Sequence, residues 1–187
     1  MTPRAVSFSQ TTLTELMIPG YANFGGKIHG GILLSLMDKV AYVCAAKHAG
    51  GYCVTVSVDQ VAFRAPVEVG ELVSLHARVN HVGRSSMVVG IRVVAEQVDS
   101  GVQKHTNTSY FTMVAKDGAG KPRPVPPLLL ETMEDVRRFL EAMKRREMRE
   151  QYLGEFDNAR TRLSAAQNIA LLAGERCVLA EGLGPVS

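Results

Sequence analysis

The stretch that decides the fold is Asn23-Phe24-Gly25-Gly26-Lys27-Ile28-His29-Gly30-Gly31, followed directly by Ile32-Leu33-Leu34-Ser35-Leu36-Met37-Asp38-Lys39-Val40-Ala41-Tyr42-Val43-Cys44-Ala45-Ala46. The second segment is almost uninterrupted apolar sequence, so we expect a core helix over residues 31–48 that ends at Ala49-Gly50-Gly51. A carboxylate inside such a helix is costly to desolvate unless partners satisfy it. Asp38 is therefore a candidate for chemistry as well as for a structural role.

Strand patterns lie on both sides of this helix. Residues 6–18 mix β-branched and polar positions and predict an edge strand, and residues 52–59 alternate, with Val61 and Phe63 extending that strand up to Pro66. Three longer strands over 71–82, 84–98 and 102–115 are joined by short turns and should form hairpins. A lone apolar helix must be covered, which predicts an α+β hotdog fold: a long buried helix wrapped by a curved antiparallel sheet of about five strands. One sheet cannot enclose the helix, so we expect a dimer in which two sheets join edge to edge.

The strand pattern gives way to a proline-rich segment at Pro122-Arg123-Pro124-Val125-Pro126-Pro127, which predicts a stiff linker that ends the sheet. We therefore expect a hotdog domain over residues 1–127 and a C-terminal helical extension and tail over 128–187. Thr132 and Asp135 have capping-box spacing, and a helix beginning there would have an apolar face of Met133, Val136, Phe139, Leu140 and Met143. The mixed charges of residues 144–150 favour a solvated helix face over a phosphate or nucleic-acid patch, and another short helix is expected around 158–172.

Composition excludes several function classes. The 187 residues have a net charge of +3, and residues 1–120 hold no basic stripe, so nucleic acid is not an expected partner. The first residues lack the apolar region of a signal peptide, and no run approaches a membrane span, so we expect a cytoplasmic protein without a membrane partner. Three cysteines without C-x-x-C spacing predict neither a disulfide frame nor a zinc site, and we expect no metal.

The skeleton Asn-x-x-Gly-x-x-x-Gly-Gly-x(6)-Asp is formed by Asn23, Gly26, Gly30, Gly31 and Asp38. With the strand of residues 54–63, the hairpin of residues 83–87 and Thr106-Asn107, it resembles the hotdog-fold acyl-CoA thioesterases of the YciA and brain acyl-CoA hydrolase type over roughly residues 10–127. The resemblance implies hydrolysis of acyl-coenzyme A to free acid and coenzyme A, with no cofactor besides the substrate's own coenzyme A. It also implies a homo-oligomer, a hexamer built as a trimer of dimers with active sites at the dimer seam.

The chemistry can be matched to these residues. Thioester hydrolysis needs a base for water and donors for the oxyanion. Asp38 can serve as a general base, or as a nucleophile, and the N–H groups of Gly30 and Gly31 at the helix start can serve as oxyanion donors. The resemblance makes Asn23 the second catalytic position, acting opposite Asp38 of the other subunit.

Each of these residues also has a structural alternative. Asp38 could be a carboxylate held by backbone donors, and Asn23 could be an ordinary turn residue. The glycines could only relieve strain in a tight turn. His29 stands at the helix start, where a capping or packing role is more frequent than a role as a base.

The turn Gly83-Arg84-Ser85-Ser86 offers a guanidinium and two hydroxyls, which suit the phosphates of coenzyme A. A solvent-exposed turn is the alternative. Two other functions also stay open: a hotdog acyl-thioester dehydratase, which needs a His and acid at a different spacing, and a non-catalytic acyl-CoA sensor, which should carry a DNA-binding segment or lack the acid.

Overall fold

A computed structural model of the chain describes residues 1–180. Its elements, in chain order, are β1 (Arg4–Ala5), α1 (Val6–Ser9), β2 (Thr11–Leu16), the 3-10 helix η1 (Pro19–Tyr21), α2 (Gly30–Ala49), β3 (Cys53–Val58), β4 (Glu71–Val82), β5 (Ser86–Gln97), β6 (Gln103–Ala115), β7 (Leu128–Leu129), α3 (Met133–Arg162), α4 (Ala165–Asn168) and η2 (Ile169–Leu172). The chain divides into two compact units, the first being residues 1–143 and the second beginning at Lys144. This division lies within α3, so the expected domain boundary at residue 127 stays a prediction.

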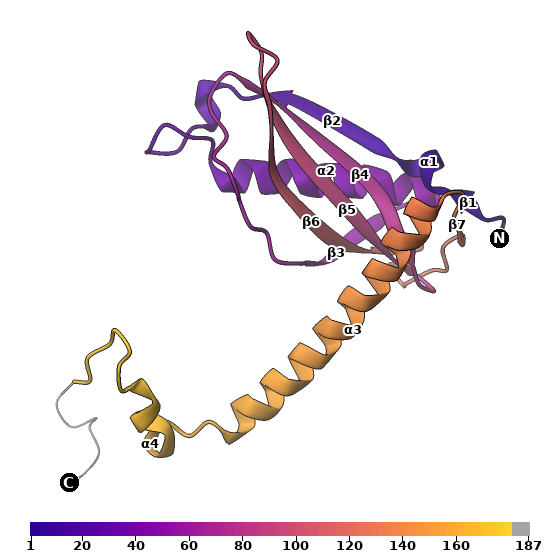
Figure 1. Cartoon of the computed structure of the whole chain (residues 1–187). Coiled ribbons are helices and arrows are strands. Elements are labelled where there is room, and N and C mark those ends of the chain that lie inside the picture. The colour runs from indigo at the N-terminus through magenta and orange to yellow at the C-terminus, as the bar shows by residue number, and fades with distance from the viewer. Residues whose placement is uncertain (181–187) are drawn as a thin grey trace. The chain divides into compact units, whose positions relative to one another are not determined.

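The first unit is built on a five-stranded antiparallel sheet with the strand order β2-β4-β5-β6-β3. The three long strands and their two hairpins agree with the sequence prediction to within two residues. β3 does not pair with β4, which follows it in the chain, but crosses to the far side of β6 and becomes an edge strand. Figure 1 shows the curved sheet with α2 lying along one face. The α+β hotdog fold predicted from the sequence is thus confirmed.

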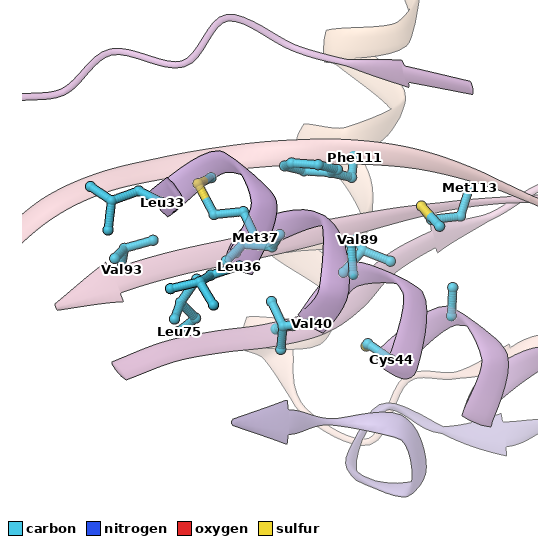
Figure 2. Close-up of a cluster of buried hydrophobic side chains, with 14 of the residues drawn as sticks. Leu33, Leu36, Met37, Val40, Cys44, Leu75, Val89, Val93, Phe111 and Met113 are labelled. Atoms are coloured by element: carbon cyan, nitrogen blue, oxygen red, sulfur yellow. The ribbon is translucent and has the colours of Figure 1, made fainter. Parts of the chain in front are cut away.

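One face of α2 forms the centre of the core. Its buried positions follow helical spacing, and they pack on side chains from the strands, as Figure 2 shows for Leu33, Leu36, Met37, Val40 and Cys44 against Leu75, Val89, Val93, Phe111 and Met113. Burying each such side chain contributes about 1.5–3 kcal/mol, which fixes the helix against the sheet. The helix ends at Gly50, whose φ of 69° lies in the left-handed region that favours glycine.

Two predicted strand segments were wrong. Residues 6–9 form a helical turn, because Val6 and Ser9 are three residues apart and only a helix buries both side chains on one side. The predicted extension of β3 through Val61 and Phe63 does not form either. The chain leaves the sheet after Val58, although the N–H of Arg64 still donates to the carbonyl of Thr106 at 2.9 Å.

The C-terminal prediction was correct for the start of α3 and only partly correct for its packed face, in which Val136 and Phe139 are half-buried. The Thr132 hydroxyl accepts from the N–H of Asp135 at 3.1 Å, and the Asp135 carboxylate accepts from the N–H of Thr132 at 3.0 Å, as in a capping box. However, Met133 and Leu140 of the expected apolar face are exposed, whereas Asp135 and Ala142 are buried. The Asp135 carboxylate turns this face toward the sheet because it pairs with Arg78 of β4.

The remaining C-terminal predictions are partly confirmed. The mixed-charge residues 144–150 are mostly exposed and form ion pairs along the helix, such as Lys144 with Glu147. The region 158–172 is helical, but its first part belongs to α3 and only α4 and η2 are separate. Within residues 1–180, no helix is long and apolar enough to cross a bilayer.

Candidate active site

Asp38 lies on α2 but on its exposed face, which corrects the expectation of a carboxylate buried in the core. The sheet covers only one side of the helix, and position 38 follows the fully buried Met37 by about 100° around the axis. The hydroxyl of Thr55 on β3 donates to Asp38 Oδ1 at 2.6 Å. This short contact fixes one carboxylate oxygen and leaves Oδ2 without a partner in the described part of the chain.

Several residues near this pair on α2 and β3 are apolar and exposed. Val56 and Val58 of β3 are 60% and 40% exposed, and Leu34 and Tyr42 of α2 are 39% and 40% exposed. The backbone of β3 is also unpaired on its outer side, because β3 is an edge strand. An exposed apolar edge of this kind is a place where another chain pairs. We call this surface, made of Asp38, Thr55 and the apolar residues of α2 and β3 around them, the seam surface.

Asn23 lies in a tight loop between η1 and α2. Its side-chain Oδ1 accepts hydrogen bonds from the N–H groups of Gly25 at 2.9 Å and Lys27 at 3.2 Å. Lys27 in turn forms an ion pair with Glu68 at 2.7 Å, so the loop is held at its far side. The side-chain amide nitrogen of Asn23 has no partner among residues 1–180. Asn23 therefore combines the expected turn role with a free pair of N–H donors.

The start of α2 is capped by His29, as the structural alternative predicted. His29 Nδ1 accepts from the N–H of Gly31 at 2.9 Å, and its carbonyl accepts from the N–H of Ile32 at 2.9 Å. The N–H of Gly30 has no partner in the described residues. Of the two glycine donors expected for an oxyanion, Gly30 is thus free, and Gly31 becomes free only if the imidazole turns away.

Asp38 and the N–H of Gly30 lie far apart within one chain. Gly30 and Asp38 are separated by eight residues of α2, which is about 12 Å along the helix axis. Figure 1 shows the loop that holds Asn23 projecting beyond the N-terminal end of the same helix. A thioester carbonyl needs its donor and its attacking water within about 3 Å, so Gly30 and Asp38 of one chain are too far apart to serve the same carbonyl group.

The hairpin at residues 83–86 stands apart from Asp38 as well. Thr55 and Met87 both pair with Met113 of β6, so the hairpin beyond Met87 lies two strands away from Thr55. Neighbouring strands are about 4.8 Å apart, which places the hairpin backbone on the order of 10 Å from β3. Arg84 is exposed, and its guanidinium has no partner among the described residues.

The two cysteines buried in the core are poor candidates for a nucleophile. Burial raises the pKa of Cys44 to about 12, and burial also raises the pKa of Cys53, so neither thiol is a ready thiolate. Within the described residues, no group of three metal-ligating side chains is placed to hold an ion.

The sequence did not single out Thr55, the residue that contacts Asp38. In Val54-Thr55-Val56 it reads as one more β-branched strand residue, and nothing in its spacing from Asp38 indicates contact. Only the crossing of β3 to the edge of the sheet beside α2 brings the two side chains together.

Comparison with known proteins agrees with this architecture. The family model described as the Thioesterase superfamily matches residues 25–102. The chain is 45% identical to protein VdlD of Helicobacter pylori over 137 residues, which are 73% of this chain and 78% of VdlD. A solved hexameric acyl-CoA thioesterase is 37% identical, with a TM-score of 0.79, and the match covers 82% of this chain and 98% of that chain. This chain belongs to the thioesterase superfamily.

A second solved relative, which was crystallised with coenzyme A ligands, supports the assignment to this family. An acyl-CoA hydrolase from Staphylococcus aureus, solved with butyryl coenzyme A and coenzyme A, is 30% identical with a TM-score of 0.75, covering 91% of this chain and 98% of that chain. The family assignment and the relatives together make this hotdog protein an acyl-CoA thioester hydrolase.

Proposed function

We propose that the protein hydrolyses acyl-coenzyme A to a carboxylic acid and coenzyme A at a site formed by two subunits. One subunit supplies Asp38 and Thr55 from its seam surface, and the other supplies Asn23 and the N–H of Gly30 from the start of its α2. The observation that carries this proposal is the hydrogen bond from Thr55 to Asp38 on an exposed apolar edge, with the N–H of Gly30 in the same chain too distant to take part.

Asp38 acts as the general base in this proposal. Its free Oδ2 takes a proton from water while the water oxygen bonds to the thioester carbon, and the carbonyl oxygen becomes an oxyanion. The N–H donors at the start of the partner's helix stabilise that oxyanion, helped by the helix dipole. Collapse of the intermediate breaks the carbon–sulfur bond, and the proton on Asp38 passes to the departing thiolate of coenzyme A. A direct attack by Asp38 on the carbonyl is the alternative route to the same products.

The geometry of Asn23 assigns it a donor role. Its Oδ1 already accepts two backbone hydrogen bonds, so the side chain offers its amide N–H groups to the thioester or to the water. Structures of the S. aureus hydrolase carry alanine at an asparagine, at an aspartate fifteen residues further on, or at a threonine seventeen residues beyond that. Asn23, Asp38 and Thr55 have the same two spacings in this chain, which supports their grouping in one site.

An oligomer is needed for this site, and we propose a dimer joined through β3 and α2 as its unit. The apolar residues of the seam surface would be covered in such a dimer, which removes water from Asp38 and strengthens its interactions. Because a matching solved thioesterase is hexameric, we extend the proposal to a trimer of dimers. Residues 1–127 form the thioesterase domain in this proposal, and residues 128–187 its C-terminal extension.

We also propose that Gly83, Arg84, Ser85 and Ser86 bind the phosphates of coenzyme A. The N–H of Gly83 donates to the carbonyl of Ser86 at 2.8 Å, so the hairpin is ordered before ligand binds. The free guanidinium of Arg84 suits a phosphate at the far end of an extended substrate.

Measuring thiol release from a panel of acyl-coenzyme A chain lengths tests this function. Asp38→Asn should lower kcat by at least about 100-fold, the scale expected for losing a general base, while the protein stays folded. Asp99→Asn is the matched control, because Asp99 is an exposed carboxylate in the β5–β6 turn. Near-normal turnover by Asp38→Asn would rule out the base role of Asp38.

A further inference from the structure

A pocket of about 420 Å³ lies on the face of the sheet opposite to α2. Two rows of cross-strand neighbours form its floor, because Arg92 pairs with Thr108 and Gly90 pairs with Tyr110. Alternation along the strands places these side chains away from the core: Ile91 and Phe111 are buried on the α2 side, while Arg92 and Thr108 are exposed. The pocket therefore has no side chain in common with the proposed active site.

Gly90 lies in this floor and packs closely against the side chain of Asn80. A Cβ atom at position 90 would collide with the side chain of Asn80 and crowd the ring of Tyr110, so a larger residue does not fit without rearrangement. Arg78, Arg92 and Tyr110 line the pocket around this glycine.

Three arginines line the pocket, and no carboxylate does. Arg78 pairs with Asp135, and Arg138 donates from Nε to Glu134 at 2.6 Å. Hydrogen bonds from Arg137 and Arg138 lower the pKa of Glu134 to about 2, so this carboxylate is ionised at neutral pH. Burial alone would raise the pKa of Asp135, but hydrogen bonds from Thr132 and Arg78 outweigh it and lower that pKa.

The carboxylates of Asp135 and Glu134, which do not line the pocket, thus hold Arg78 and Arg138 in place. The third arginine of the pocket, Arg92, has no such carboxylate partner. The guanidinium of Arg92 has no partner in residues 1–180, and Arg78 Nε is buried without a hydrogen bond. An unpaired arginine in one pocket with two arginines that are held by carboxylates forms a preorganised set of charged donors. The Thr108 hydroxyl, which also lines the pocket, already lies 2.8 Å from His105 Nε2.

We propose that this pocket binds the phosphate group of a small molecule, with Arg92 and Arg138 as its charged donors. A phosphate dianion matches several guanidinium groups better than a single carboxylate does, because it presents more acceptor oxygens and more charge. The volume exceeds that of one phosphate ion and lies within the range of small-molecule sites. Such a phosphate can come from free phosphate or pyrophosphate, or from the nucleotide part of coenzyme A.

Isothermal titration calorimetry on the full chain at low ionic strength tests the proposal, because exposed cations are screened by salt. The titrants are inorganic phosphate, pyrophosphate and adenosine 3′,5′-bisphosphate, which distinguish the two sources. Arg92→Gln removes the unmatched charge from an exposed position and should raise Kd for at least one titrant by about tenfold or more. Lys121→Gln is the matched control, with the same charge change in the turn after β6.

The outcomes separate this pocket from the proposed coenzyme A hairpin. Binding that Arg92→Gln weakens and Arg84→Gln leaves intact supports the pocket, whichever phosphate source binds. The reverse pattern, equal weakening by Lys121→Gln, or no saturable binding up to about 10 mM of any titrant would overturn it. A change of oligomeric state in Arg92→Gln without any bound titrant would assign the pocket to a subunit contact and would overturn it as well. Because the readout is binding, it does not depend on the proposed catalytic residues.

Discussion

Replacing Thr55 by valine tests whether the hydroxyl that holds Asp38 contributes to catalysis. Valine has nearly the same shape and the same preference for strands, so β3 should form as before. What is lost is the single donor to Asp38 Oδ1, a contact of 2.6 Å. Since Thr55 is exposed in the chain, the change creates no cavity in the core.

The magnitude follows from the type of hydrogen bond. A hydrogen bond to a charged group contributes about 1.5–3 kcal/mol. If that bond holds the carboxylate in the orientation that the attacking water requires, its full loss raises the barrier by that amount. At about 1.4 kcal/mol for each factor of ten, kcat should fall by roughly 10- to 100-fold. KM should change little, because Thr55 does not contact the proposed phosphate-binding hairpin.

The assay is steady-state thiol release from the best acyl-coenzyme A of the panel. Thr55→Ser is the matched control, because serine keeps the hydroxyl and should retain activity within about fivefold of the wild type. A kcat for Thr55→Val within about threefold of the wild type would refute the positioning role. An equal loss in Thr55→Val and Thr55→Ser would show that the strand, rather than the hydroxyl, is disturbed.

Two further predictions address substrate binding and stability. Arg84→Ala should raise KM for acyl-coenzyme A about tenfold or more while leaving kcat nearly unchanged. KM for an acyl-pantetheine thioester, which lacks the nucleotide, should not change. An equal rise in KM for both substrates would contradict a phosphate contact. Burial, opposed by a 3.0 Å hydrogen bond to the Pro126 carbonyl, lowers the pKa of His48, so below about pH 6.5 the unfolded chain takes up a proton that the folded chain does not. The free energy of unfolding, measured with urea, should therefore fall as pH drops from 7 to 5. The fall should be smaller in His48→Gln than in His76→Gln, a control at an exposed histidine. An identical pH dependence in both variants would contradict this linkage.

The core and the long strands could be predicted because the spacing of apolar residues along the sequence follows which positions are buried. The apolar face of α2 and the alternation along β4 to β6 each indicate one element in one orientation. Asp38 shows the limit of that argument, since an apolar helix does not reveal which of its faces the sheet leaves open. The apolar positions beside Asp38 have the pattern of core residues in the sequence but are exposed in the chain, and under the proposal above a second chain covers them.

The contact between Asp38 and Thr55 could not be predicted because it depends on topology. β3 pairs with β6 although β4 and β5 lie between them in the sequence, and a local pattern does not specify such a pairing. The start of α3 was predictable, since a capping box is local, but its packed face depends on the ion pair between Asp135 and Arg78 across 57 residues. The turn at Asn23 is local and could be predicted. The proposed donor role of its amide could not, because it depends on the observation that Oδ1 already accepts two backbone hydrogen bonds.

Subunit mixing tests the two-subunit site most directly. Asn23→Ala and Asp38→Ala proteins, each inactive alone, are combined under conditions that exchange subunits, with exchange verified by native mass spectrometry. Mixed dimers have one site with both residues intact and one with neither, so statistical exchange should restore up to about a quarter of wild-type activity per subunit. Thiol release that stays at the level of the separate variants, despite verified exchange, would contradict a site formed by Asp38 of one subunit and Asn23 of its partner.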